Sequence, residues 1–243
     1  MKDLFTEKYD CYFREIGKED NDPNEIGEYN RYPQMMPWIG KDYDNGNPKR
    51  LLLIGESHYL PDCADGDYKT KEGWYYQEPD ALDEESIGWT NTREVVGIGP
   101  KAWTKGHTLY REVNKVIGDL KGEDFRNNNM FKYVAYYNYF LRPAYPKGNS
   151  FKNICEEQDL NVAYDAFCWI VKAIKPDFVY FFSKFAWESL LKKNPDIKGV
   201  KMDYSPHPAC SWWNRENFHL ENHDELLSGK KKFSYFLQDN KIL

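Results

Sequence analysis

The sequence lacks the cysteine pattern of a metal site or a redox site. Its five cysteines stand at positions 11, 63, 155, 168 and 210, and no two of them form a C-x-x-C pair. This spacing excludes a zinc ribbon, a dithiol redox centre and the usual iron–sulfur signatures. We therefore expect no metal ion and no cofactor.

A signal peptide and a membrane span are also missing from the sequence. The first residues, MKDLF, are too polar to begin a signal peptide, and no apolar stretch approaches the length of a membrane-spanning helix. The sequence therefore predicts a reduced, cytoplasmic protein with no membrane partner. A monomer is favoured, although nothing in the sequence specifies the oligomeric state.

An excess of positive charge is absent as well. The chain has 33 Lys and Arg against 39 Asp and Glu, a net charge of −6. Binding of nucleic acid over a broad surface normally needs a basic face. The negative net charge argues against such a face and is compatible only with a local basic groove. Aromatic residues, by contrast, make up 17% of the chain. That share is too high for a disordered chain, and flat rings suit stacking on bases.

Apolar runs alternate with amphipathic segments along the chain. The runs predict strands at Arg50–Gly55, Phe131–Phe140, Asp177–Phe182 and Lys201–Tyr204. Helical spacing of apolar residues predicts helices at His107–Leu120, Leu160–Ile174, Lys184–Lys193 and 222–239. This alternation predicts a single α/β domain over 1–243, with three α/β/α layers and a four-stranded, mainly parallel central sheet. We expect 1–48 to form an N-terminal cover segment with a short helix around Phe5–Ile16, and 60–104 to form a long connection.

Polar side chains follow the predicted strands at the point where each strand ends. The first strand reads LLLIG and is followed at once by Glu56, Ser57, His58 and Tyr59. The second strand carries Asn138 and Phe140 at its end, and the fourth leads to His207 between two prolines. Because parallel strands end at one edge of a sheet, where α/β proteins bind their ligands, these side chains are expected to converge there.

The order of these motifs resembles the uracil-DNA glycosylase superfamily. Gly55–Tyr59 is similar to its Gly-Gln-Asp-Pro-Tyr or Gly-Glu-Ala-Pro-Gly element, and Tyr136–Pro143 contains its strand-ending asparagine and its Arg-Pro. Val179–Ala186 resembles its strand followed by Gly-Lys-x-Ala, and His207–Ala209 resembles its His-Pro-Ser loop. Ser57 stands where that family has a water-activating aspartate. The resemblance implies a uracil-DNA glycosylase-like fold and a DNA glycosylase that excises a damaged or deaminated base during DNA repair.

The resemblance also implies roles for individual residues. Glu56 is expected to orient water or stabilise a cationic sugar, and His207 to stabilise charge on the departing base; these two are the predicted catalytic residues. Since such enzymes take the base out of the helix, the other strand-end residues are expected to contact it. The predicted substrate-binding residues are Gly55, Ser57, His58, Tyr59, Asn138, Phe140 and Arg215.

Two other functions fit the same residues. The acidic charge and Ser57 favour a non-catalytic module that holds nucleic acid, a nucleotide or a protein partner. Alternatively, Gly55–His58 resembles the Gly-Glu-x-His element of erythromycin-esterase-like hydrolases, in which Glu56 and His58 would act together. Each of these side chains also has an ordinary structural alternative, such as capping a helix or satisfying a backbone group.

Overall fold

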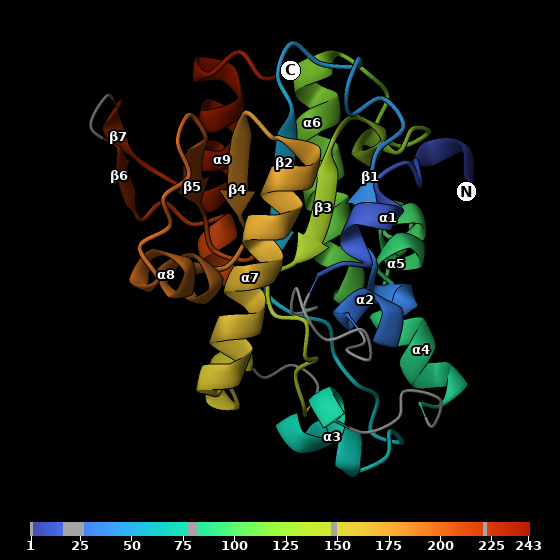
Figure 1. The fold of residues 1–243 in the computed structure, drawn as a ribbon. Helices are drawn as coiled ribbons and strands as arrows, with labels where there is room; N and C mark the ends of the chain where they lie inside the picture. The colour runs from blue at the N-terminus through green and yellow to red at the C-terminus, as the bar shows by residue number, and fades with distance from the viewer. Residues whose placement is uncertain (1, 17–26, 77–81, 147–149, 221–222) are drawn as a thin grey trace.

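The computed structural model describes residues 2–16, 27–76, 82–146, 150–220 and 223–243 (Figure 1). Its helices are α1 (Asp10–Phe13), α2 (Glu28–Arg31), α3 (Lys71–Tyr76), α4 (Glu84–Thr90), α5 (Thr92–Ile98), α6 (Thr108–Lys121), α7 (Glu157–Ile174), α8 (Lys184–Lys192) and α9 (Gly229–Asp239). Its strands are β1 (Trp38–Ile39), β2 (Leu51–Gly55), β3 (Ala135–Asn138), β4 (Phe178–Phe181), β5 (Lys201–Tyr204), β6 (Phe218–Leu220) and β7 (His223–Leu227). The protein is thus of the α/β class.

The central sheet has five strands in the order β1-β3-β2-β4-β5. The four strands predicted from the sequence pair in parallel, β3 with β2, β2 with β4, and β4 with β5. The expected count of four is wrong, because β1 pairs antiparallel with β3 at the edge and makes the sheet mixed. At two residues, β1 is too short to show the alternation that identifies a strand in a sequence.

Three predicted elements differ from the structure. The strand predicted at Phe131–Phe140 is shortened, because Met130–Tyr133 forms a 3₁₀ helix before β3 begins. The helix predicted over 222–239 is wrong in its first part, which belongs to the antiparallel pair β6–β7. The helix α9 begins at Gly229, after its N-cap residue Ser228, whose side chain accepts a hydrogen bond from the Lys231 backbone amide. The short helix expected around Phe5–Ile16 is reduced to α1.

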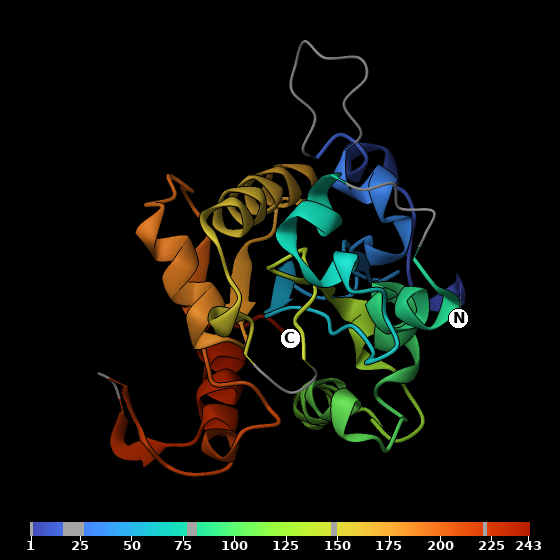
Figure 2. The same cartoon turned by 90° about the horizontal axis from the view of Figure 1, so that it is seen from below.

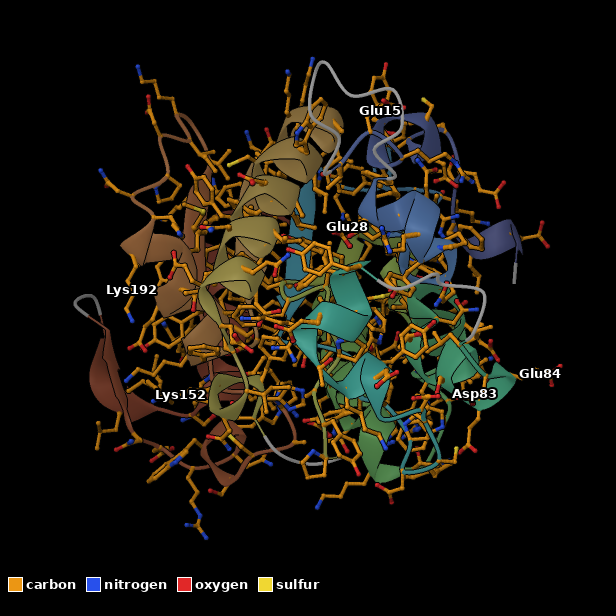
Figure 3. All side chains as sticks on the ribbon, turned by 60° about the horizontal axis from the view of Figure 1, so that its bottom comes forward. Glu15, Glu28, Asp83, Glu84, Lys152 and Lys192 are labelled. Carbon is orange, nitrogen blue, oxygen red and sulfur yellow. The ribbon has the colours of Figure 1, made fainter. Side chains whose placement is uncertain are left out.

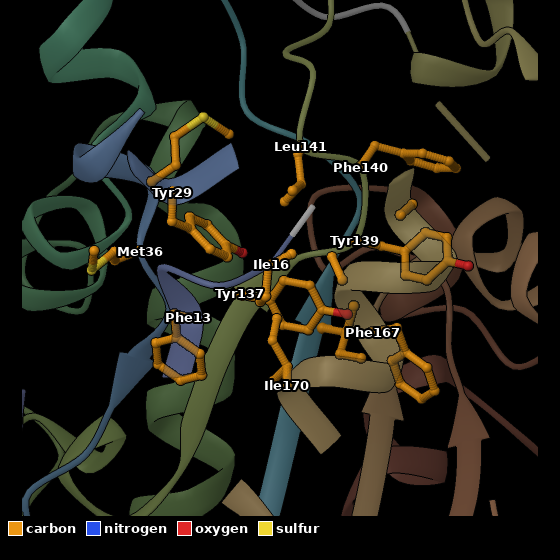
Figure 4. Packing of buried hydrophobic residues seen from close by; sticks show 14 of the residues in the cluster. Phe13, Ile16, Tyr29, Met36, Tyr137, Tyr139, Phe140, Leu141, Phe167 and Ile170 are labelled. Atoms are coloured by element: carbon orange, nitrogen blue, oxygen red, sulfur yellow. The ribbon is translucent and has the colours of Figure 1, made fainter. Parts of the chain in front are cut away.

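Each face of the sheet is covered by its own apolar core. Leu52 and Ile54 face one core, which includes buried residues of α7 and α8, and Leu51 and Leu53 face the other, which includes buried residues of α6 and α9. All four leucine and isoleucine side chains are fully buried, as expected for a strand covered on both faces. Figure 4 shows the first core, in which Tyr137 of β3 lies among side chains of the N-terminal segment and α7.

The connection 60–104 contains α3, α4 and α5. The chain leaves the lower end of β2 in Figure 1 and continues downward to α3, which lies below the sheet. Figure 2 looks from this side onto the edge where the parallel strands end. Within the part of the chain that the structure describes, no helix combines the length and the apolar character needed to cross a bilayer.

Candidate active site at the carboxyl edge of the sheet

The parallel strand pairing continues beyond the strand ends and brings their following residues together. The backbone amide of Phe140 donates to the Glu56 carbonyl at 2.9 Å, and that of Ser205 donates to the Phe181 carbonyl at 2.9 Å. Glu56 after β2, Phe140 after β3 and the segment leading to His207 after β5 therefore lie along one edge of the sheet (Figure 2). The carboxyl end of such a sheet is the usual ligand site of α/β proteins.

Three neutral donors hold the Glu56 carboxylate. Oε1 accepts from the Ser150 hydroxyl at 2.9 Å and from the Phe151 backbone amide at 2.8 Å. Oε2 accepts from the Ser183 hydroxyl at 2.5 Å. Among the residues described, no Lys, Arg or His nitrogen forms an ion pair with Glu56. The carboxylate is thus fixed in direction while its negative charge is left without a cationic partner.

Both serines that donate to Glu56 are also N-cap residues of helices. Ser183 is the second residue after β4 and caps α8, accepting a hydrogen bond from the Ala186 amide at 3.1 Å. Ser150 caps the short 3₁₀ helix Phe151–Asn153 in the same way. A capping hydroxyl can accept a bond from its helix and still donate its own proton, and both serines donate that proton to Glu56. The sequence signal for Ser183 is a serine between a strand and a helix, whereas Ser150 is brought to the site only by tertiary structure.

His207 lies within electrostatic reach of Glu56. The ring is partly buried, and burial lowers the pKa of His207, while the nearby Glu56 charge opposes that shift. The Ala209 backbone amide donates to Nδ1 at 3.1 Å. Because Nδ1 accepts this hydrogen bond through its lone pair, the neutral ring carries its own proton on Nε2. His207 is therefore arranged as a neutral hydrogen-bond donor through Nε2.

A buried ion pair supports the loop that reaches Glu56. Arg142 donates to Asp159 twice, from Nε at 2.8 Å and from Nη2 at 2.6 Å, and Nη2 also donates to the Ile154 carbonyl at 2.6 Å. The guanidinium lies 5.2 Å from the centre of the Phe151 ring. Arg142, the arginine of the Arg-Pro motif, thus holds both ends of the short segment whose Phe151 amide binds Glu56.

Asn138 and Gly55 meet at the ends of their strands. Asn138 is buried, and its Oδ1 accepts from the Tyr136 hydroxyl at 2.9 Å. A Cβ atom at Gly55 would lie 2.2 Å from Asn138 Oδ1 and 2.3 Å from the Tyr136 hydroxyl oxygen. The close approach that requires glycine here is therefore made by side chains of β3. One lone pair of the Asn138 oxygen is already used within the protein.

Phe140, predicted to contact the substrate, is enclosed by the protein's own rings. Phe151 stacks on it with ring centres 4.5 Å apart, and Phe185 stacks at 5.1 Å. The side chain has no exposed surface. A base could stack on Phe140 only if one of these two rings moved aside.

Of the remaining predicted residues, some lie at the same edge of the sheet as Glu56, and His58 points into the protein instead. Tyr59 is half-buried, and its pKa is raised mainly by burial and further by the Glu56 charge, which places it near Glu56. Ser57 is half-exposed at the same edge, and Arg215 is exposed on the loop after His207. His58 is instead buried, with Nε2 2.9 Å from the Thr92 hydroxyl, which itself donates to the Met35 carbonyl. Its contacts connect the end of β2 to the beginning of α5.

The described residues were also compared with the side-chain groups that bind metal ions. The described ranges contain no cluster of three or more His, Cys, Asp or Glu side chains that could hold a metal ion.

The chain matches no protein-family model, no curated protein and no solved structure. Its function must therefore be inferred from the geometry of Glu56 and His207.

Proposed function

We propose that this protein hydrolyses the N-glycosidic bond of a damaged or deaminated base in DNA, as a divergent uracil-DNA glycosylase-like enzyme. The proposal is supported by two side chains at the carboxyl edge of the sheet: Glu56, whose carboxylate has no cationic partner among the described residues, and His207, which lies within electrostatic reach of it and can donate through Nε2. Breaking this bond produces positive charge on the sugar and negative charge on the base. Each of the two side chains suits one of these charges.

Glu56 would act on the sugar side of the bond. Its carboxylate accepts from Ser150, Phe151 and Ser183 and from no cation among the described residues, so its charge would be available to a developing oxocarbenium ion or to a water molecule that donates to it. Preorganised charge of this kind stabilises a transition state strongly in many enzymes, because it needs no reorganisation during the reaction. The serine donors would keep the carboxylate in place and directed at the sugar.

His207 would act on the base. Its Nε2 proton can donate to a carbonyl oxygen of a leaving pyrimidine or purine, where negative charge accumulates. Burial keeps the ring neutral near pH 7 because it lowers the pKa of His207. A neutral donor stabilises the anionic base without requiring a prior protonation step. Asn138 could then offer its amide to the edge of the base.

Single-turnover base release tests this proposal. Oligonucleotides containing uracil, hypoxanthine or xanthine would be incubated with enzyme in excess, in single-stranded and duplex form. We expect release by the wild type, a loss of about 10²- to 10⁴-fold for Glu56→Gln and of about 10²- to 10³-fold for His207→Ala. Glu188→Gln, which neutralises an exposed carboxylate paired with Lys184, serves as the control and should leave release unchanged. Absence of release from every substrate would refute the proposal.

The enclosure of Phe140 favours one alternative, a non-catalytic nucleic-acid or nucleotide-binding module on the same fold. With both Phe151 and Phe185 stacked on Phe140, the ring offers no free face for a flipped base. Binding of abasic or base-containing oligonucleotides without release, unchanged in Glu56→Gln, would support the module. The esterase-like alternative needs Glu56 and His58 to act together, and the bond between His58 and Thr92 gives it no support.

A further inference from the structure

Trp103 projects from the loop between α5 and α6 into solvent. Its side chain is 90% exposed, the highest value among the large apolar residues that stand exposed in the described part of the chain. Tryptophan carries one of the largest apolar surfaces of any side chain, and proteins usually bury it. A single exposed apolar residue is common on protein surfaces, so what Trp103 can do depends on how its loop is held and on the charges near it.

The loop around Trp103 is held firmly. Arg111 of α6 donates through Nη1 to the carbonyls of Ala102 and Thr104, the two residues that flank the tryptophan, and through Nη2 to the Thr108 hydroxyl. The Thr104 hydroxyl in turn pairs with His107 Nδ1 at 2.5 Å. Because the backbone on both sides is fixed, Trp103 is presented outward by the structure of the loop, and binding would cost little ordering entropy.

The sequence segment that contains Trp103 is basic in a chain that is acidic as a whole, and Glu112 follows directly after it. The segment 101–111 reads KAWTKGHTLYR and contains no Asp or Glu, although the chain has a net charge of −6. Lys101 and Lys105 are exposed, and within the described ranges neither of them forms an ion pair. Figure 3, which draws the described side chains as sticks, labels Glu15 near α1, Glu28 in α2, and Asp83 and Glu84 at the start of α4. An exposed ring beside unpaired lysines is the combination that binds nucleic-acid strands.

This loop lies on the same side of the molecule as Glu56 and His207. The helix α6 begins at the edge where the parallel strands end (Figure 2). The indole nitrogen of Trp213 donates to Glu112 of α6 at 3.1 Å, which joins the first turns of α6 to the loop that follows His207. Trp212 in that loop is itself 45% exposed. A strand bound at Trp103 could thus continue toward the candidate active site.

We propose that Trp103, with Lys101 and Lys105, binds a DNA strand outside the active site, with Trp103 stacking on an unpaired base and the lysines contacting phosphates. The inference rests on the proposed function, because it assigns DNA as the ligand of this edge. It adds a contact that lies on the α5–α6 loop, apart from the motifs that carry the resemblance to glycosylases. The partner is a single strand or an unpaired region, since a duplex hides the faces of its bases.

Binding would be measured by fluorescence anisotropy of labelled oligothymidylate, at low salt, with the full chain carrying Glu56→Gln so that no base is released. We expect Trp103→Ala to weaken binding by about 5- to 150-fold, and Trp103→Phe to weaken it less. Lys101→Ala and Lys105→Ala should each lower the slope of log affinity against log salt by about 0.7. Tyr12→Ala, which removes another exposed ring, is the control and should have no effect.

The outcomes separate this inference from the proposed function. If Trp103→Ala binds as well as the control, the Trp103 surface is not a DNA site, even if base release is observed. If the wild type releases no base but Trp103→Ala and the lysine variants weaken binding as expected, the inference stands and the glycosylase proposal fails. A failure of the chain to bind any oligonucleotide at low salt would overturn both. Equal binding of oligothymidylate and a matched duplex would refute the stacking role of Trp103.

Discussion

Two carboxylates near the end of the sheet, Asp159 and Glu56, are held by similar numbers of hydrogen bonds but differ in charge balance. Asp159 has a fully buried side chain and accepts from Arg142, from the Tyr75 hydroxyl and from the Glu156 amide. Within the described residues, Glu56 is half-buried and accepts from two hydroxyls and one backbone amide. Asp159 is therefore neutralised by a cation, whereas Glu56 has no cationic partner in the described part of the chain.

This difference separates a structural charge from one that is available to a ligand. A buried ion pair with all its hydrogen bonds made is fixed, and removing either partner leaves the other uncompensated. A carboxylate held only by neutral donors is not neutralised within the protein, so its negative charge can interact with a bound ligand. The same contrast applies to the two histidines, because His58 is enclosed beside Thr92 while Nε2 of His207 has no bond assigned to it in the described structure.

The largest effect is expected when Asp159 is changed to Asn. The substitution keeps the shape of the side chain but leaves the Arg142 guanidinium buried without a counter-charge, so the free energy of unfolding should fall by about 3–5 kcal/mol. Urea denaturation measures it. Glu157→Gln, which alters an exposed pair with Lys193, is the control and should change stability by less than about 1 kcal/mol. Equal effects of the two substitutions would remove the basis for calling Asp159 structural.

His58 should make stability depend on pH. Burial lowers its pKa from 6.5 to about 4, so the unfolded chain takes up a proton on this residue at a higher pH than the folded chain does. Its contribution is present above pH 6.5 and is lost as the pH falls toward 4, by about 3 kcal/mol in all. The variant His58→Gln should lack this contribution. Urea denaturation of the wild type and of His58→Gln across this pH range tests the prediction. If the stability of both proteins changes with pH in the same way, the prediction is wrong.

A comparison of Ser183 with Ser228 distinguishes the loss of a hydrogen bond to Glu56 from the loss of a helix cap. Both serines cap a helix, α8 and α9 respectively, but only Ser183 donates to Glu56. Each change to Ala should lower stability by about 0.5–2 kcal/mol through loss of the cap. Base release should fall only in Ser183→Ala, because only there does Glu56 lose a donor. A matching fall in Ser228→Ala would mean that the effect arises from stability.

The smallest change in stability is expected for Glu56→Gln. Its carboxylate compensates no cation in the described structure, and the amide oxygen of glutamine can still accept from the Phe151 amide. The free energy of unfolding should therefore change by about 1 kcal/mol or less, although we expect base release to fall strongly. Thermal and urea unfolding give this value. A loss comparable with that of Asp159→Asn would show that Glu56 is also a structural charge.

The sequence predicted the parallel core of the sheet well, because each strand is a short apolar run between amphipathic helices. The segment Lys201–Tyr204 forms β5 as predicted, and Lys184–Lys193 differs from α8 by one residue. Prediction was poorer where neighbours determine the conformation. The pair β6–β7 occupies part of a predicted helix, and β1 depends wholly on its pairing with Tyr136 and Ala135.

For the candidate site, the sequence determined which chemical groups stand at the strand ends, since an apolar run followed by Glu56 and a proline-flanked His207 can be identified from residue types alone. Only the tertiary structure decided their environments. It placed Ser150, distant in sequence, on the Glu56 carboxylate, enclosed His58 beside Thr92 and stacked Phe151 and Phe185 on Phe140. The reason is that burial, hydrogen-bond direction and charge compensation depend on contacts between distant segments, which periodicity along a chain does not encode.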